Sequence, residues 1–284
     1  MSATSVAQPL PFPAVRRTRR SSALLTLARR RAMLTSRTPR QIAVPLVGPA
    51  MLALILAPAL KKATGGLHSH IDYTSFVGVG AIGLVIPLSC VFAGLSVLVD
   101  RHTGAQRELL AAPIPRAFLV LGNMAVALVL AALQAIVVVG LSALRGGKFH
   151  VTGAGVAWFL AAAVLFTVFM YALAETVAAK VTKEEDFVGA TPVIAILPFF
   201  FAGALFPISA MPAVLTAIAK AMPLTHALAL LRYGVVDPSG KGLHEIWGLS
   251  NVTVEAWLSI AVVALFAAAL TALSVRVFSR SAVA

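Results

Sequence analysis

The sequence has little charge and almost no cysteine. Charged residues make up 12% of its 284 residues, whereas hydrophobic residues make up 60%. Soluble domains carry about 25% charged and about 45–50% apolar residues, so this composition excludes a soluble domain. The single cysteine, Cys90, lies inside an apolar run and can form neither an internal disulfide nor a cysteine metal cluster. A multi-span, all-α membrane protein is therefore predicted.

The sequence also lacks the short motifs of nucleotide binding and hydrolysis. The pattern G-x-x-x-x-G-K-[ST] does not occur, because the Gly-Lys pairs at Gly147 and Gly240 have no upstream glycine at that spacing. Neither G-x-S-x-G nor H-E-x-x-H occurs, and the six histidines are scattered, with His68 and His70 interpreted as polar loop residues. We therefore expect no catalytic site, no metal site and no cofactor in this chain.

Six apolar runs are long enough to cross a hydrocarbon core, which needs about 20 helical residues. They lie at about 42–60, 76–99, 118–144, 156–179, 187–207 and 256–278. Six crossings place both termini on one side, and that side holds 16 of the 23 Lys and Arg residues: nine in the N-terminal tail, three in the second-to-third loop, two in the fourth-to-fifth loop and two at the C-terminus. The positive-inside rule makes this side cytoplasmic.

The N-terminal forty residues precede the predicted membrane domain of residues 41–280. Residues 1–15 are rich in Ala, Ser, Pro and Gln and show no periodicity, and we expect a disordered tail over residues 1–20. Residues 21–40 are expected to form an amphipathic helix in the headgroup layer, with Arg31 snorkelling from its apolar side. The alternative is a solvated positive topology signal. The nine arginines within 16–40 indicate a membrane surface rather than nucleic acid, despite the net charge of +13.

Residues 100–116 (DRHTGAQRELLAAPIPR) form a charged island between two apolar runs and must lie in water. Thr103 and Gln106 have the spacing of a capping box, which predicts a helix start. Pro113 should prevent the helix from continuing. The stretch predicts a short helix that could receive a push from a soluble partner and pass it to the spans.

The apolar stretch 203–234 is divided by Pro207, Pro212 and Pro223 into pieces too short to span a membrane. Two short re-entrant helices at the outer face are predicted, rather than a seventh crossing. Irregular backbone at membrane depth requires burial in protein or a wet cavity.

Three polar residues lie within predicted spans. Glu175 is the deepest ionisable side chain, and an intramembrane carboxylate is a functional candidate. Its position one turn from the interface and near Lys180 favours a merely structural role. Asn123 and Gln134 are interpreted as hydrogen-bond contacts between helices.

Two segments together resemble a known family. The first is the loop from Asp100 to Leu110, followed by Pro113 and Arg116, with an acidic start, a Thr-Gly element and a Leu-Leu pair. The second is FPISAMP at 206–212, followed by MPLTH at 222–226 and Leu231-Arg232. They are similar to the permease subunit of a type-2 ATP-binding-cassette (ABC) exporter, in the group that resembles daunorubicin-resistance permeases of actinobacteria. The order of elements agrees from about residue 21 to 280.

The resemblance implies a half-transporter in a bacterial plasma membrane. Two permeases, identical or paralogous, would join two separate ATPase subunits that bind ATP and Mg²⁺. It implies coupling to the ATPase through Asp100, Arg101, Thr103, Gly104, Gln106, Arg107, Glu108, Leu109 and Leu110. Leu109 and Leu110 either dock the partner or pack against the chain's own spans. The implied outer re-entrant segment carries Pro207, Pro212, Pro223, Thr225, His226 and Arg232, and the expected substrate is a hydrophobic drug, an antibiotic or a lipid-like molecule.

A secondary transporter or channel without an ATPase is the main alternative. Such proteins often show internal repeats or midplane charges. No repeat is visible in this sequence, and only Glu175 is a candidate midplane charge. A membrane enzyme is disfavoured because no acid, base and nucleophile can be assembled.

Overall fold

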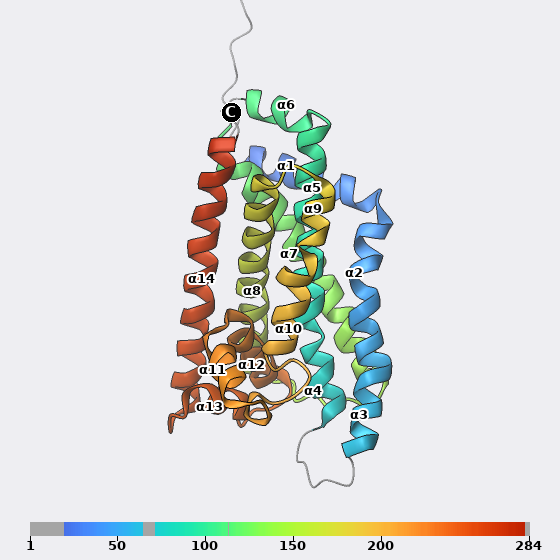
Figure 1. The fold of residues 1–284 in the computed structure, drawn as a ribbon, viewed down its shortest axis with the longest axis vertical. Helices are drawn as coiled ribbons and strands as arrows, with labels where there is room; N and C mark the ends of the chain where they lie inside the picture. Colours follow the sequence, from blue (N-terminus) through green and yellow to red (C-terminus); the bar gives the residue numbers. More distant parts are fainter. Residues whose placement is uncertain (1–19, 65–71, 113, 282–284) are drawn as a thin grey trace, which may run out of the picture.

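The computed structural model describes residues 20–64, 72–112 and 114–281, and every regular element in these ranges is helical (Figure 1). Five helices in them are long and apolar enough to cross a membrane. The five are Pro39–Ala63, formed by α2 (Pro39–Met51), a π-helical turn (Leu52–Leu56) and α3 (Ala57–Thr64); Tyr73–His102, formed by α4 (Tyr73–Gly80) and α5 (Ile82–His102); α7 (Ala117–Leu144); α8 (Gly153–Lys180); and α14 (Val252–Ser281).

The predicted fifth span at 187–207 is wrong in its bounds and continuity. The segment consists of α9 (Glu184–Gly189), a π-helical turn (Pro192–Ile196) and α10 (Leu197–Phe201), and the helix ends there. Proline has no N–H to donate, so the prolines at 192 and 198 weaken a continuous hydrogen-bond ladder. The segment lies beside α5 and runs from near α6 (Ala105–Ala111) toward α12 (Pro223–Val235) (Figure 1).

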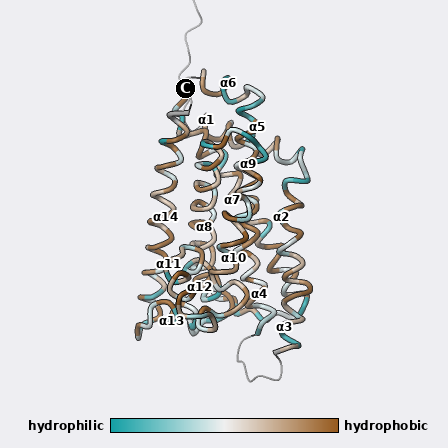
Figure 2. The backbone as a smooth tube through the Cα atoms, in the orientation of Figure 1, coloured by the Kyte–Doolittle hydropathy of each residue, from teal (hydrophilic) through white to brown (hydrophobic). Residues whose placement is uncertain are grey.

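Helix α8 is the centre of the packed bundle. It packs against α5, α7, α12 and α14, and it supplies two of the largest fully buried side chains, Phe166 and Tyr171. Hydrophobic residues predominate along the middle of the helices, and hydrophilic residues gather toward both ends (Figure 2). Such an apolar band is what a bilayer requires of the helices that face it.

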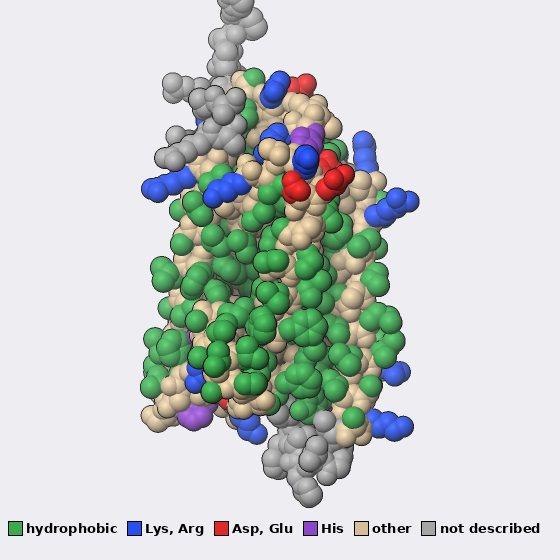
Figure 3. All heavy atoms as spheres, viewed as in Figure 1, with side chains coloured by type: hydrophobic (Ala, Val, Ile, Leu, Met, Phe, Trp, Pro, Cys, Tyr) green, Lys and Arg blue, Asp and Glu red, His purple; other side chains and the backbone are tan. Residues whose placement is uncertain are grey.

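The two ends of the bundle differ. Helix α1 (Arg20–Ser36), α6 and the last turns of α14 lie at one end, called here the α6 end. Helices α3, α11 (Ala213–Ala221), α12 and α13 (Lys241–Trp247) lie at the opposite end, called the α12 end (Figure 1). Lys and Arg side chains are visible at both ends, with a hydrophobic surface between them (Figure 3).

The prolines of the 203–234 stretch separate short helices, as predicted. A 3₁₀ turn (Ile208–Ala210) follows Pro207, Pro212 directly precedes α11, and Pro223 is the first residue of α12. Met222 between α11 and α12 is extended, which is the conformation that a following proline favours. The two helices meet at an angle of 82°, and together they are also apolar enough for one broken crossing. The re-entrant arrangement therefore stays a prediction.

The predicted disordered tail lies almost wholly outside the described residues, as do His68 and His70. Helix α1 occupies most of the predicted 21–40 helix. Leu24, Leu27, Ala28, Arg31 and Thr35 are buried or half-buried along one stripe, whereas Leu25 and Leu34 are exposed. Helix α1 packs chiefly on α7 through this stripe.

Candidate coupling end and outer pocket

Helix α6 is separated from α5 by a left-handed turn at Gly104. The backbone N–H of Thr103 donates to the Val99 carbonyl at 2.9 Å, and that of Gly104 donates to the Arg101 carbonyl at 3.2 Å. Gly104 has a φ of 81°, a conformation that glycine adopts without steric cost. The change of direction places α6 beyond the end of the bundle (Figure 1).

The predicted capping box is wrong. The Thr103 hydroxyl donates backwards to the Val99 carbonyl at 3.0 Å, so it satisfies the end of α5 rather than the start of α6. Gln106 is buried, and its side-chain oxygen has no hydrogen-bond partner within the described residues. The short helix nevertheless forms and ends at Ala111, before Pro113, which lies outside the described residues.

The side chains of α6 divide into an outer and an inner set. Arg107 and Glu108 are exposed. Leu109 and Leu110 are half-buried and pack against the core, so the alternative of contact with the chain's own helices is the one observed. The charged pair is consequently the part of α6 that is free to meet another molecule.

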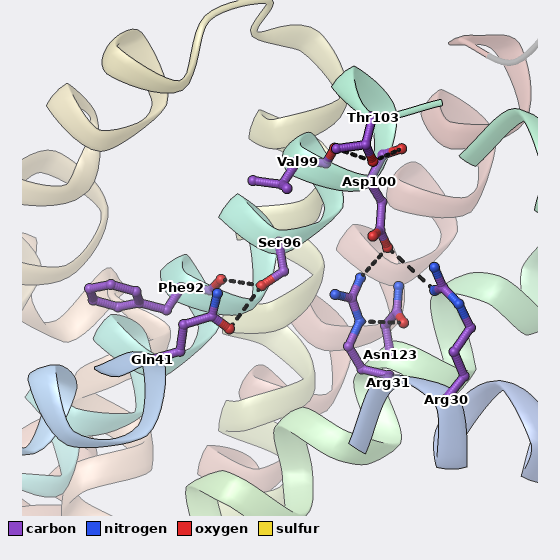
Figure 4. A network of polar contacts seen from close by, with 9 residues as sticks. All are labelled: Arg30, Arg31, Gln41, Phe92, Ser96, Val99, Asp100, Thr103 and Asn123. Carbon is purple, nitrogen blue, oxygen red and sulfur yellow. Dashed lines mark hydrogen bonds and ion pairs between the residues drawn. The ribbon is translucent and has the colours of Figure 1, made fainter. Parts of the chain in front are cut away.

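Asp100, in the last turns of α5, is the centre of a polar network at the α6 end (Figure 4). Its Oδ2 lies 3.0 Å from Arg31 Nη2 and 3.5 Å from Arg30 Nη1. Arg31 Nε also donates to Asn123 Oδ1 at 2.9 Å. This network joins α1, α5 and α7, and it confirms Asn123 as an interhelical contact.

The predicted snorkelling of Arg31 is wrong, because the side chain points into the bundle and the residue is only 7% exposed. A carboxylate and an amide oxygen satisfy its guanidinium there, which offsets part of the cost of removing a charge from water. Nearby, the Ser96 hydroxyl donates to Gln41 Oε1 at 3.2 Å, a separate contact that joins α2 to α5 (Figure 4).

The residues between Asp100 and α6 also contact the α8–α9 connection. The Arg101 guanidinium donates to the carbonyls of Ala179, at 3.2 Å, and Val181. His102 Nε2 lies 2.8 Å from the Thr182 carbonyl, and its Nδ1 lies 3.4 Å from Glu184 Oε1. Arg101 and His102 thus connect the end of α5 to a fourth part of the bundle.

Glu175 is fully buried and contacts α14 rather than Lys180, which is exposed. Ser274 Oγ donates to Glu175 Oε2 at 2.9 Å. Gln134 is confirmed as an interhelical contact, since it accepts from the Ser89 hydroxyl and donates to the Ile42 carbonyl at 3.0 Å.

At the α12 end lies a cavity of about 340 Å³, called here the outer pocket. Its polar lining comes from Asp72, Ser75, Lys148, His150, Thr225, Arg232, Asp237, Lys241 and Glu245. Of the predicted re-entrant residues, the structure brings Pro207, Thr225 and Arg232 to this pocket. Pro212, Pro223 and His226 do not line it.

His226 has a packing role instead. Its Nε2 lies 2.9 Å from the Lys220 carbonyl, and its Nδ1 lies 3.2 Å from Ser259 Oγ. Trp247 Nε1 donates to the same oxygen at 2.8 Å. These contacts join α11, α12, α13 and α14.

Asp72 was not identified from the sequence. Burial would raise the pKa of its carboxyl, but hydrogen bonds from the Lys148 backbone N–H, the Lys61 ammonium and the Ser75 hydroxyl together lower that pKa below its ordinary value of 3.8. The Lys61–Asp72 distance is 2.9 Å. The one available sequence signal was an acidic residue directly before an apolar run, a common place for a helix cap.

Across the ranges that the structure describes, no group of three or more His, Cys, Asp or Glu side chains could hold a metal ion. The ordered polar groups instead form helix-to-helix contacts at the α6 end and the outer pocket at the α12 end.

No curated protein matches the sequence. A family model described as "ABC-2 type transporter" matches residues 22–236, which is most of the chain and includes α1, α6 and α12. The family implies an ABC ATP-binding partner. With its five long apolar helices, the chain therefore belongs to the ABC-2 type transporter family, as a multi-pass transmembrane subunit of an ABC transporter.

Proposed function

We propose that this chain is the permease subunit of an ATP-driven exporter, in the group similar to daunorubicin-resistance permeases. Two permeases, identical or paralogous, assemble with two separate ATPase subunits that bind ATP and Mg²⁺. The complex lies in a bacterial plasma membrane, with both termini and α6 in the cytoplasm. Two observations support this orientation: 16 of the 23 Lys and Arg residues fall on that side, and α1, α6 and the end of α14 share one end of the bundle (Figure 1).

The observation that carries the proposal is the placement of α6. It is outermost at its end of the bundle, with Arg107 and Glu108 exposed. The three residues before its turn, Asp100, Arg101 and His102, contact α1, α7 and the α8–α9 connection. A displacement of α6 by a closing ATPase therefore reaches several helices at once, as a coupling helix requires.

Helix α1 is proposed as an interfacial helix that borders both the headgroups and the ATPase. Leu25, Met33 and Leu34 are exposed and suit the headgroup boundary, and Arg29 is exposed to solvent or phosphate. In this division, residues 1–20 are a tail, residues 21–40 the interfacial helix and residues 41–280 the permease domain.

The proposed substrate is a hydrophobic drug, an antibiotic or a lipid-like molecule. In support, a groove of about 520 Å³ lies between α7 and α8, and its lining is almost wholly apolar, including Ile136, Phe159 and Leu160. Apolar grooves favour ligands that gain by leaving water.

The coupling role is tested by changing Arg107 and Glu108 together to Ala in the permease co-reconstituted with its ATPase. We expect normal membrane insertion but loss of permease-stimulated ATP hydrolysis and export, since both side chains are exposed and form no ion pair with any residue that the structure describes. A matched control changes Lys62 and Arg145, which are exposed at the α12 end, to Ala and should leave both activities intact. Full ATPase stimulation and export in the α6 variant would contradict the proposal.

A further inference from the structure

The outer pocket lies at the opposite end of the bundle from the polar network around Asp100. Its walls are one face of α12, the start of α4 with the preceding Asp72, the loop after α7 and the segment from Val236 to α13. Thr225, Ala229 and Arg232 line it from α12, at the i, i+4 and i+7 spacing of a single helical face.

Thr225 lines this pocket and carries an unused hydrogen-bonding group. Its residue exposure is 3%, and its hydroxyl has no hydrogen-bond partner within the described residues. Buried hydroxyls are nearly always paired, because an unpaired one loses its bonds to water without replacement. A hydroxyl at the wall of a cavity is satisfied when a molecule with a polar group occupies that cavity.

Arg232 supplies a buried positive charge without a carboxylate at ion-pair distance in the described ranges. The residue is 9% exposed, and its guanidinium donates to the carbonyls of Gly203 at 2.9 Å and Ala204 at 2.7 Å. Its Nε and Nη2 also donate to the Phe76 carbonyl, at 3.4 Å and 3.3 Å. It also lies over the Phe76 ring, 3.4 Å from the centroid. Carbonyl dipoles and a ring face offset only part of the cost of burying a charge, so an anion at this site is favoured.

Gly80 lets the backbone come this close. A Cβ at Gly80 would collide with the Ala204 carbonyl and would lie 3.0 Å from Arg232 Nη2. The carbonyls of Gly203 and Ala204 are thus held against the guanidinium by packing, and the pocket wall is built rather than accidental.

The carboxylates that line the outer pocket already have local partners. Asp72 pairs with Lys61 and accepts from the Lys148 backbone N–H at 3.0 Å. Asp237 accepts from the Lys241 backbone N–H at 2.9 Å, and Glu245 accepts from the Ser209 hydroxyl at 3.0 Å. The side-chain ammonium groups of Lys148 and Lys241, by contrast, form no ion pair with any residue that the structure describes. With Asp72 paired to Lys61, the cations Lys148, Arg232 and Lys241 outnumber the carboxylates of Asp237 and Glu245 by three to two, so the net charge of the lining is positive.

The loop after α7 separates the outer pocket from the apolar groove. Lys148 and His150 line the pocket, whereas Phe149 and Val151 line the groove. The His150 backbone N–H donates to the Val235 carbonyl at 2.8 Å, which fixes this alternation against α12. A polar site and an apolar surface therefore share one wall, an arrangement that suits an acidic group carried on a lipid as well as a free anion.

We propose that the outer pocket is a binding site for an oxyanion, a phosphate or carboxylate group, which accepts hydrogen bonds from Thr225 and charge-assisted contacts from Arg232, Lys148 and Lys241. The site does not depend on the proposed export activity, and binding can be measured on the full chain alone.

The test uses the purified full chain in nanodiscs of phosphatidylcholine, with three probes: inorganic phosphate, glycerol 3-phosphate and added phosphatidylglycerol. Binding is followed by the shift in thermal unfolding midpoint and by native mass spectrometry. Binding of inorganic phosphate identifies a free-anion site, and binding of phosphatidylglycerol alone identifies a lipid headgroup site. Either result supports the proposal, and binding should weaken as salt is raised.

The decisive variants are Thr225→Val and the double change Lys148→Gln with Lys241→Gln. Thr225→Val removes a hydroxyl that has no partner, so it should fold normally while weakening binding about tenfold, the loss expected for one hydrogen bond to a charged group. Thr253→Val and Lys62→Gln, at exposed positions away from the pocket, are the matched controls. The proposal is overturned if the wild-type chain binds none of the probes, or if the pocket variants bind as tightly as the controls.

Discussion

Replacing Asp100 by Asn should destabilise the protein more than removing either arginine that it contacts. Asp100 has two cationic partners, whereas the buried Arg31 has one carboxylate and one amide oxygen. Asp100→Asn keeps the shape of the side chain but leaves the Arg31 guanidinium buried with no negative charge beside it. Arg31→Gln instead leaves Asp100 beside Arg30.

The expected loss of stability for each substitution follows from how exposed the side chains are. Removing one partner of a buried pair costs about 3–5 kcal/mol. The side chains of Arg31 and Asp100 are 8% and 17% exposed, so we take the lower limit, about 3 kcal/mol for Asp100→Asn. Arg30 is 33% exposed and lies 3.5 Å away, so Arg30→Gln should cost below about 1 kcal/mol. Arg31→Gln should fall between, at about 2 kcal/mol, because two hydrogen bonds are lost.

The measurement is the free energy of unfolding of the purified protein, from titration with a denaturing detergent followed by circular dichroism. A double-mutant cycle between Arg31 and Asp100 should give a coupling energy of about 2 kcal/mol, and the cycle between Arg30 and Asp100 should give far less. Equal effects of Asp100→Asn and Arg30→Gln, or a coupling energy near zero for Arg31, would refute the inference that this network holds α1 to α5.

Two other perturbations act at the α12 end. Because folding lowers the pKa of Asp72, its contribution to stability is present above the ordinary value of 3.8 and is lost as pH falls through the lower pKa of the folded state. The difference in melting temperature between wild type and Asp72→Asn should therefore be large at pH 7 and shrink in acid. A difference that does not change with pH would contradict this prediction. Changing Pro212 and Pro223 to Ala releases Met222 from its extended conformation and allows α11 and α12 to merge. We therefore expect normal insertion of this variant with loss of export. Wild-type export would show that the 82° bend between the two helices is not required.

Length and hydropathy were enough to predict the five long apolar helices to within a few residues of their ends. The fifth predicted span failed for a physical reason: its prolines allow a helix only in pieces, and the point at which the chain stops being helical depends on packing against α5 and α11. The first span extends to Pro39, because proline is well tolerated at the start of a helix.

The sequence predicted where the coupling end and the outer pocket lie along the chain, but it did not predict which side chains contact one another there. Sequence spacing correctly indicated a helix after residue 103, yet Thr103 had two competing bonds available and made the backward one to Val99. A helical wheel places Arg31 on the apolar side of α1. It could not show that Asp100 of α5 and Asn123 of α7 accept hydrogen bonds from the Arg31 side chain there. The unpaired hydroxyl of Thr225 is a property of the assembled fold, and no sequence pattern reports it.

The π-helical turns at Leu52–Leu56 and Pro192–Ile196 change which face of the helix each following residue occupies. The Ala57 backbone N–H donates five residues back to Leu52, and that of Leu197 donates five residues back to Pro192. One residue added to a turn rotates all that follows by about 100°. Positions on either side of Leu52–Leu56 that a continuous wheel assigns to one face therefore point in different directions. A scan of substitutions along this span has to be plotted on two wheels, offset at the π turn, before its lipid-facing and protein-facing stripes can be distinguished.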